Sequence, residues 1–466
     1  SRGLGDVYKR QGKGVATDWN ISDDGLTYTF KLRNNSHWAM FSGHKAVLGE
    51  NYEDTFDITV KAEDFKFGIE RTLSEQTGSA DAPLFSAVKS ISTPDDFTIV
   101  FNLSYADDNF LYALTNPGAM PCDEEFFNLT NGKYGLDAKY LLCNGPFHVS
   151  KWTEKTSVKL AKNNEYNGES SVSPSSVTFY INNDDSEVAD KMNSVTYDVA
   201  FLSSSQFSSI ENKKDLNSVA VQNVTYSFIF NQNDNNYRNK NMRLAFCRSC
   251  DTSSLFDSQS DISKADGIVP PSCKIGGEDY RNGNAAELLS YDETLAKKNF
   301  NDALLELGSS SVETTILCTE QYEPFVKQMV QKLQKTLGVK FVSTVKVVSE
   351  SDLEAAVNDG NYSVAFYPFK AKSSFAGEII EVFDQNNIFG YESDVLSQKI
   401  RNIKNNSGSL EGERSAVADA ENYLVSEAVI MPVFYENSYF VTSKKTSGIY
   451  FYSSADNVCF INAKKS

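Results

Sequence analysis

The chain has 466 residues, of which 40% are hydrophobic, and it carries 44 lysines and arginines against 62 aspartates and glutamates, a formal net charge of −18. A chain of this length exceeds one hydrophobic core, which predicts two or three lobes, and its apolar content argues against disorder. The excess of negative charge repels phosphate groups and argues against a nucleic-acid partner.

The apolar runs and the opening residues bear on where the protein resides. No run approaches the eighteen apolar residues that a membrane-spanning helix needs. The first residues, SRGLGDVYKRQ, lack the apolar core of a signal peptide. We expect that this stretch is not native sequence and that the natural N-terminus is missing.

The first predicted element is a β-hairpin. In GLTYTFKL, residues 25–32, polar and apolar side chains alternate with the period of a strand. Asp24 and Gly25 precede the strand and supply the positive φ of a tight hairpin turn. The hairpin is therefore expected to be a scaffold feature and not a site.

Further elements follow in the first half of the chain. Residues 61–73 are expected to form an amphipathic helix, because apolar residues recur every four positions and acids stand at its beginning, where the helix dipole favours them. The strands predicted after it are DDFTIVFNLS, a hairpin pair in FHVSKWTEKTSVKLAKN, and SSVTFYIN.

In the second half, strands and helices alternate as in α/β sheets. Residues 322–338 predict a helix, with Phe325, Met329, Leu333 and Leu337 at steps of four and Gly338 as its stop. The other predictions are a strand at VTYSFIFN, a helix around KNMRLAFCRSCD and a strand at VKFVSTVKVV. Residues 415–442 are expected to form first a helix and then a strand that Pro432 opens.

Motifs of catalysis and metal binding are mostly absent from the sequence. It contains no GxxxxGK[ST], HExxH or GxSxG pattern, and only three histidines could serve as bases: His37, His44 and His148. His37 and His44 are either metal ligands on a folded loop or, the favoured interpretation, two ordinary loop residues. Asp184 and Asp185 lack the DxDxDG spacing of a calcium loop and are expected in a solvated turn.

Seven cysteines are too few for a disulfide framework in a chain of this length. Cys247 and Cys250 form a CxxC pair that could be redox-active or half of a metal site. The sequence has no second CxxC and no histidine nearby, so we favour two small apolar residues on one helix face.

Seven segments in a fixed order resemble the extracellular solute-binding proteins, family 5, of oligopeptide, dipeptide and nickel importers. The resemblance extends from about Trp19 to about Ile461. The segments are WNISDDGLTYTFKLRNNSHW; KAEDFKFGIERTL; NGPFHVSKW with VKLAKNNEYNG; FIFNQND with MRLAFCRSCD; ADGIVPP; YDETLAKKNFNDALLELG; and EAVIMPVFYENS.

The resemblance implies an α/β, two-lobed periplasmic-binding-protein type II fold with an extra small domain and a truncated N-terminus. The missing part would hold the signal sequence, the first strands of lobe one and, in a lipoprotein, the lipid-bearing cysteine. Chain crossings near Tyr226 and Met431 would form the hinge. The implied division is 12–142, the extra domain of lobe one; 143–225, lobe one; 226–430, lobe two; and 431–466, a return to lobe one.

The implied function is that of the substrate-binding component of an ABC importer, which captures a peptide or similar small solute between the lobes and delivers it to a membrane permease. The resemblance implies no enzyme activity and no cofactor, and a monomer held by a lipid anchor at the outer face of the cell membrane or free in the periplasm. The alternatives are a peptide-sensing lipoprotein and a hydrolase on the same fold that uses His37 or His148.

Positions in the matching motifs predict the ligand-binding residues, although aromatic residues on strands can equally belong to the core. They are Tyr226, Phe228, Asn231, Phe366, Tyr367, Phe369, Tyr435 and Asn437.

Two departures from the family pattern matter. Where peptide-binding members resemble ADYNEP, with an aspartate for the peptide's amino group, this chain has YPFKAKSSFAGE, with no acid before Glu378. The pocket is therefore expected to discriminate little between free and acetylated peptides, unless Glu378 or Glu436 replaces that aspartate. Lys61 stands where the family's helix opens with threonine, and the lost N-cap oxygen is worth about 1 kcal/mol.

Overall fold

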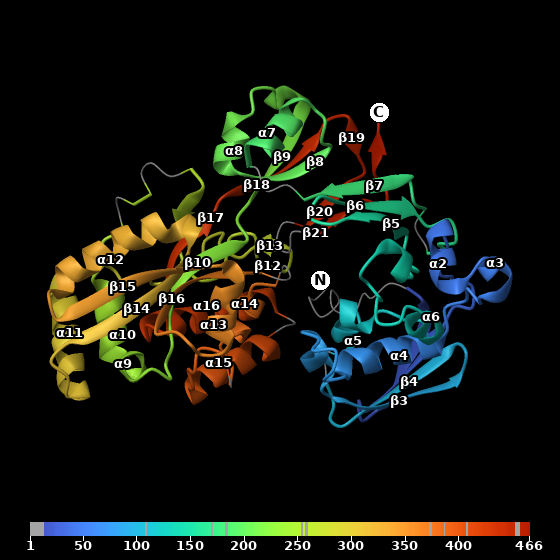
Figure 1. Cartoon of the computed structure of the whole chain (residues 1–466). Helices are drawn as coiled ribbons and strands as arrows, with labels where there is room; N and C mark the ends of the chain where they lie inside the picture. The colour runs from blue at the N-terminus through green and yellow to red at the C-terminus, as the bar shows by residue number, and fades with distance from the viewer. Residues whose placement is uncertain are drawn as a thin grey trace. The chain divides into compact units, whose positions relative to one another are not determined.

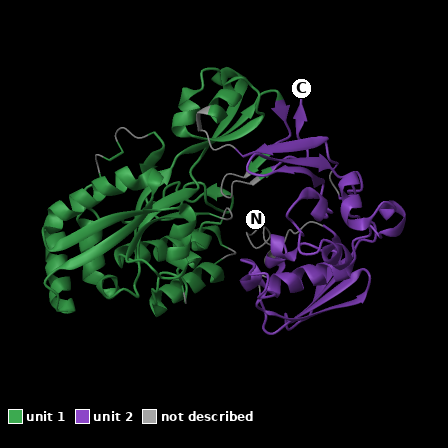
Figure 2. Ribbon diagram, in the orientation of Figure 1, with its two compact units in different colours: residues 1–10, 185–445, 450–458 green, residues 11–184, 446–449, 459–466 purple. Residues whose placement is uncertain are grey.

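The computed structural model describes residues 14–107, 110–168, 171–181, 185–252, 255–256, 260–371, 375–385, 387–406, 409–452 and 457–466. The described chain forms two compact units, drawn in different colours in Figure 2. Unit 1 contains residues 185–445 and 450–458, and unit 2 contains residues 14–184, 446–449 and 459–466. Within these ranges, no helix is long and apolar enough to cross a membrane.

Unit 2 begins with an antiparallel sheet of four strands in the order β1-β2-β4-β3. The predicted hairpin is confirmed: β1 pairs with β2 from Ile21 opposite Tyr28, and Gly25 in the turn has φ +69°. Tyr28 and Phe30 point into a core that the sheet shares with α4. The bounds are β1 (Ala16–Ile21), β2 (Thr27–Leu32), β3 (Val88–Asp95), β4 (Thr98–Leu103) and α4 (Ala62–Leu73).

The helix α4 confirms the prediction for residues 61–73 and shows how it begins. Lys61 is the N-cap and provides no side-chain cap. Its main-chain N–H instead donates to Asp64 Oδ2 over 2.7 Å, the half of a capping box that the third helical residue supplies. The carboxylate of Asp64 thus satisfies the main-chain N–H of Lys61 at the start of the helix.

The rest of unit 2 consists of short helices and a second antiparallel sheet, β5-β6-β7, which contains the predicted hairpin. The strands are β5 (Phe147–Thr153), β6 (Ser157–Lys162), β7 (Ser176–Tyr180), β19 (Thr446–Ser447) and β22 (Lys464–Lys465), and the helices are α2 (Lys45–Leu48), α3 (Tyr52–Thr55), α5 (Phe110–Ala113) and α6 (Glu124–Leu129). Asp184 of the acidic cluster lies outside the described residues, and Asp185 begins α7 (Asp185–Asn193) of unit 1.

Unit 1 is built around a mixed sheet of six strands in the order β11-β17-β10-β16-β14-β15 (Figure 1). Here β14 is parallel to β15 and β16, whereas β10 is antiparallel to β16 and β17. The strands are β10 (Val224–Phe230), β11 (Ile262–Lys264), β14 (Val312–Thr319), β15 (Phe341–Val348), β16 (Val364–Lys370) and β17 (Ile430–Glu436).

Helices cover both faces of this sheet, with one hydrophobic core on each side. Side chains of α10, α11 and α12 fill the first core, and side chains of α13, α14, α15 and α16 fill the second. The helices are α9 (Asn235–Arg238), α10 (Lys240–Arg248), α11 (Glu293–Leu307), α12 (Glu323–Leu337), α13 (Glu350–Asn358), α14 (Gly377–Glu381), α15 (Asp394–Asn405) and α16 (Leu410–Ser426).

The prediction for residues 322–338 is confirmed, because α12 ends at Leu337 and Gly338 follows with φ +78°. The prediction that Pro432 opens the last strand is wrong: β17 begins at Ile430. Pro432 is accommodated inside the strand by a register shift, since Tyr226 pairs with Phe434 and Ser227 with Pro432. Such a bulge interrupts the ladder at this position, which suits proline because proline has no N–H to donate.

A smaller sheet, β8-β18-β9, completes unit 1 together with α7 and α8. Tyr226 and Met431, where a hinge is predicted, both lie within strands of the six-stranded sheet, and the compact units divide instead at residues 184/185 and 445/446. The four-part division stays a prediction. The remaining elements are α8 (Ser204–Ser209), β8 (Val199–Ser203), β9 (Leu216–Val221), β12 (Lys274–Ile275), β13 (Glu278–Asp279), β18 (Ser438–Ser443), β20 (Tyr450–Tyr452) and β21 (Asn457–Cys459).

Candidate ligand-binding edge of unit 1

One edge of the six-stranded sheet collects the carboxyl ends of β14, β15, β16 and β17 and the amino end of β10. This follows from the strand directions, because β10 is antiparallel to both β16 and β17. Open α/β sheets bind their ligands outside the carboxyl ends of the strands. We call this side of unit 1 the carboxyl edge.

A group of aromatic rings, which we call the aromatic collar, lies at the carboxyl edge on the α12 face of the sheet. The ring centroids of Tyr226 and Tyr322 are 4.4 Å apart, and that of Phe434 is 5.1 Å from Tyr226 and 5.3 Å from Tyr322. Phe325 and Phe366 complete it, at 5.1 Å and 5.5 Å from Phe434. Tyr226 and Phe325 are half-buried and the other three rings are buried, so two of the five rings are partly accessible to solvent.

Local sequence explains how the collar forms. Alternation along β10 directs Tyr226 to the α12 face, and Tyr322 ends the short 3-10 turn, Glu320–Tyr322, that joins β14 to α12. Phe325 stands in the first turn of α12, so its ring lies at the same end of the sheet. The amino end of β10 and the beginning of α12 thus place the rings of Tyr226, Tyr322 and Phe325 side by side.

A carboxylate joins the collar at the end of β17. Tyr322 Oη donates a hydrogen bond of 2.9 Å to Glu436 Oε1, and Gln321 Nε2 donates to Tyr322 Oη over 3.1 Å. Burial, and after it the negative charge of Glu436, raises the pKa of the Tyr226 phenol. Both tyrosines therefore stay neutral and remain hydrogen-bond donors at physiological pH.

An amide cluster forms beside the collar, around the predicted residue Asn437. Its Oδ1 accepts from Gln222 Nε2 over 2.7 Å and from Ser263 Oγ over 3.0 Å, and its Nδ2 donates to the main-chain oxygen of Ser260 over 3.0 Å. Gln222 Nε2 also lies 2.9 Å from Ser263 Oγ. Three segments distant in sequence thus meet through side-chain amides and a hydroxyl.

The opposite face of the carboxyl edge holds Tyr367, Phe369 and Tyr435. Phe369 is 5% exposed and its ring centroid lies 5.6 Å from that of Tyr367, which is half-buried. Tyr435 is 2% exposed, and its Oη accepts a hydrogen bond from the main-chain N–H of Asp266 over 3.0 Å. On this face, Tyr367 is therefore the most accessible of the predicted residues.

The structure brings Tyr226, Tyr367, Phe369, Tyr435 and Asn437 to the carboxyl edge. Phe366 pairs with Phe228 in the ladder and is likewise 1% exposed, so it forms the buried inner side of the collar. Phe228 and Asn231 are not edge residues. Phe228 is 1% exposed and packs on Phe246 in the core. Asn231 follows the far end of β10, where its amide donates to the main-chain oxygens of Gly360 and Tyr362, each over 2.8 Å. Whether any of the eight contacts a ligand stays a prediction.

Sequence reasoning missed Tyr322, Phe325 and Gln222 as edge residues. Their signal was available in part: Tyr322 is the first residue of the helix predicted for residues 322–338, and Gln222 stands two residues before the strand predicted at VTYSFIFN. What the sequence does not show is that β14 and β10 lie in the same sheet with their opposite ends together.

The three histidines, His37, His44 and His148, belong to unit 2, whereas the carboxyl edge belongs to unit 1. His44 is buried between the rings of Phe41 and Phe126, with Nε2 3.3 Å from the main-chain oxygen of Leu141, and burial lowers its pKa to about 4. In the described part of the chain, none of the three histidine rings makes a hydrogen bond to a serine or cysteine. The described residues also contain no group of three metal-ligating side chains.

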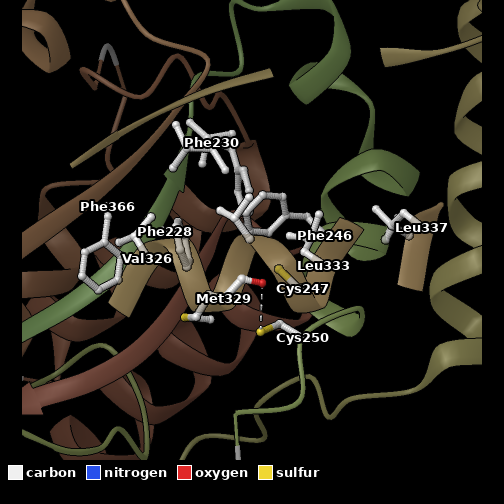
Figure 3. Close-up of a cluster of buried hydrophobic side chains, with 14 of the residues drawn as sticks. Phe228, Phe230, Phe246, Cys247, Cys250, Val326, Met329, Leu333, Leu337 and Phe366 are labelled. Atoms are coloured by element: carbon white, nitrogen blue, oxygen red, sulfur yellow. Dashed lines mark hydrogen bonds between the residues drawn. The ribbon is translucent and has the colours of Figure 1, made fainter. Parts of the chain in front are cut away.

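The CxxC pair lies in the core of unit 1 (Figure 3). Cys247 is 2% and Cys250 4% exposed, and Cys250 Sγ donates to the main-chain oxygen of Met329 over 3.8 Å. Burial raises the pKa of both thiols to about 12, so neither is a thiolate at neutral pH. These surroundings fit the interpretation as small apolar residues. The prediction that both lie on one helix face is wrong, because α10 ends at Arg248 and Cys250 follows it.

A sheet covered by helices on both faces defines an α/β protein, and its carboxyl edge carries aromatic rings and side-chain amides. The sequence profile of the bacterial extracellular solute-binding proteins, family 5, matches residues 12–388. The chain belongs to this family.

Solved structures share the fold at low sequence identity. OppA of Listeria monocytogenes bound to peptide matches with a TM-score of 0.73 and 21% identity, over 98% of this chain and 90% of that one. The dipeptide-binding protein of Pseudoalteromonas sp. SM9913 in complex with Met-Leu matches with a TM-score of 0.74 and 17% identity, over 97% and 91% of the two chains.

Among characterised relatives, the dipeptide-binding protein DppE of Bacillus subtilis is 23% identical over 458 residues, which cover 93% of this chain and 80% of DppE. The oligopeptide-binding protein AliB of Streptococcus pneumoniae is 26% identical over 339 residues, 62% of this chain and 50% of AliB.

Proposed function

We propose that the protein is the substrate-binding component of an ABC importer, which captures a peptide or similar small solute and delivers it to a membrane permease. The observation that carries the proposal is the carboxyl edge of unit 1 in a family 5 chain, where the aromatic collar and the amide cluster lie side by side. The names of DppE and AliB, which bind dipeptides and oligopeptides, support the solute class.

The two parts of the edge suit different parts of a peptide. Partly exposed rings such as Tyr226 and Phe325 offer apolar surface that tolerates many side chains. The amides of Gln222 and Asn437 can exchange their mutual hydrogen bond for bonds to a peptide main chain, which every sequence carries. Such a site would accept peptides of many sequences and would recognise them mainly through their main-chain groups.

We further propose binding without catalysis, by a monomer at the outer face of the cell membrane or in the periplasm. A hydrolase needs a nucleophile, a base and an oxyanion site in one pocket. The low pKa and buried surroundings of His44 suit a structural residue better than a base of that kind.

Native mass spectrometry of freshly purified protein tests the proposal, followed by calorimetry with any released solute or with a peptide mixture. We expect a retained solute of peptide mass, and binding that Tyr226→Leu weakens. Tyr291→Leu is the matched control, because Tyr291 is an exposed tyrosine of unit 1 outside the carboxyl edge. Binding to neither peptides nor other small solutes would contradict the proposed function.

A further inference from the structure

A cavity of about 210 Å³ lies in unit 1 along the amino half of β17. In the described part of the chain, β11 pairs only with Phe434–Glu436 of that strand. The preceding residues, Ile430–Val433, line the cavity, and residues 288–291 with Cys247 and Cys250 form its other walls. The cavity is therefore distinct from the carboxyl edge, which lies at the other end of β17.

The size of the cavity limits what it can hold. One water needs about 10–15 Å³ of such space, whereas pockets for drug-sized ligands have roughly 300–1,000 Å³. A cavity of about 210 Å³ therefore suits a molecule of about ten non-hydrogen atoms and is too small for a peptide.

The wall of the cavity is mainly apolar. Burial raises the pKa of the Cys247 and Cys250 thiols to about 12, so both stay uncharged and act as small apolar groups. An apolar molecular body is favoured over water against such a wall. The aliphatic side chains that line the cavity are Leu288, Leu289, Val425, Ile430, Met431 and Val433.

A cation, Lys264, also lines the cavity. Alternation along β11 places Lys264 on the same face as Ile262, which packs in the core that contains Cys247 and Cys250. Lys264 is exposed, and among the described residues it forms no ion pair and no side-chain hydrogen bond. Its ammonium group is therefore available to an anion in the cavity.

Asp251 lines the cavity too, but a lysine offsets its charge. Lys332 Nζ donates to the main-chain oxygen of Asp251 over 2.7 Å. After the larger effect of burial, the charge of Lys332 lowers the pKa of the Cys250 thiol more than the charge of Asp251 raises it. Salt screens exposed charges beyond about 8 Å, so these nearby lysines outweigh the negative charge of the whole chain.

We propose that this cavity is a second ligand site, separate from the carboxyl edge, which binds a small monocarboxylate with an apolar body. The carboxylate pairs with Lys264, and the apolar body displaces water from the aliphatic wall.

The test uses three probes with the same apolar body: 3-phenylpropionate, its neutral amide and 3-phenylpropylamine. Ligand-observed NMR titrations measure their dissociation constants for the full chain and for Lys264→Gln. Lys346→Gln is the matched control, because Lys346 is an exposed lysine of β15, at the opposite edge of the same sheet. Leu289→Gln tests the apolar wall, and its control is Leu295→Gln, at an exposed leucine of α11 outside the cavity.

We expect the carboxylate to bind about three- to fivefold tighter than the amide, the size of effect that an ion pair with an exposed lysine gives, and the amine to bind most weakly. Lys264→Gln should abolish the difference between acid and amide, and Lys346→Gln should keep it. Leu289→Gln should weaken acid and amide alike, and Leu295→Gln should change neither.

Equal binding of acid and amide to the unmodified chain, or an advantage of the acid that survives Lys264→Gln, would overturn the inference. So would failure of all three probes to bind. Lys264 is exposed, so its replacement should leave the chain folded, which circular dichroism checks. None of these outcomes concerns peptide binding at the carboxyl edge, which is tested separately.

Discussion

Removal of one partner from the buried ion pair between Arg281 and Glu421 is expected to destabilise unit 1 more than the loss of any exposed pair. Its side chains are 8% and 1% exposed. The Glu421 carboxylate also accepts from the main-chain N–H of Val269 over 2.9 Å and from Tyr280 Oη over 3.0 Å. The pair therefore attaches the segment before α11 to the middle of α16.

Replacing Arg281 with methionine should lower the free energy of unfolding by about 3 to 5 kcal/mol, because it leaves a buried carboxylate without its cation. Chemical denaturation followed by circular dichroism measures the change. The double variant Arg281→Met/Glu421→Gln should recover most of it, since the amide carries no charge and still offers an oxygen to Val269. Asp419→Asn is the control. Asp419 lies on α16, as Glu421 does, but it is 58% exposed and pairs with Lys399 of α15, so loss of this pair should cost about 1 kcal/mol or less.

A loss in Arg281→Met no larger than in Asp419→Asn would refute this reasoning. So would a double variant that is as unstable as the single one, because the penalty would then not arise from the buried charge.

Three further predictions follow from features described above. The double variant Cys247→Ala/Cys250→Ala should keep its ligand affinity, measured by calorimetry. Thermal melts should show a modest loss of stability, about 1 to 3 kcal/mol for two buried sulfurs. Loss of a bound metal in this variant would contradict the apolar interpretation. The pKa of His44 lies near 4 in the folded chain, below its ordinary 6.5, so the unfolded chain binds a proton at a higher pH than the folded chain does. The free energy of unfolding of unit 2 should therefore fall by up to about 3 kcal/mol between pH 6.5 and pH 4. A His44→Gln variant with the same pH dependence would refute this. Small-angle scattering should give a smaller radius of gyration with a bound peptide than without it, and an unchanged radius with binding shown independently would refute closure of the lobes on the ligand.

The sequence predicts best what is local. The strand at Thr27–Leu32 and the helices at Ala62–Leu73 and Glu323–Leu337 follow from periodicity and from the glycines Gly25 and Gly338, and each lies within two residues of its predicted bounds. The strand opened by Pro432 was misplaced, because a bulge that depends on two neighbouring strands accommodates the proline.

The candidate site was only partly predictable for a related reason. Tyr226 and Asn437 lie at the carboxyl edge because the family's motifs mark strand ends, but Asn231 marks the other end of the same strand. The meeting of Tyr322 with Glu436 depends on sheet order, which joins residues 114 positions apart. No periodicity in a single sequence encodes that contact.

The amide cluster has a mechanical consequence. Two strands run from the small sheet into the large one side by side: β9 continues into β10, and β17 continues into β18 in the opposite direction. Between the two sheets each chain segment has a joint of one or two residues outside the named strands, Gln222 and Asn223 in one and Asn437 in the other. The 2.7 Å bond from Gln222 to Asn437 links the two joints. Two parallel connections that are linked in this way bend more readily about the line through the link than they twist. If a solute binds the amides of Gln222 and Asn437 as proposed, it would change the stiffness of both connections at once.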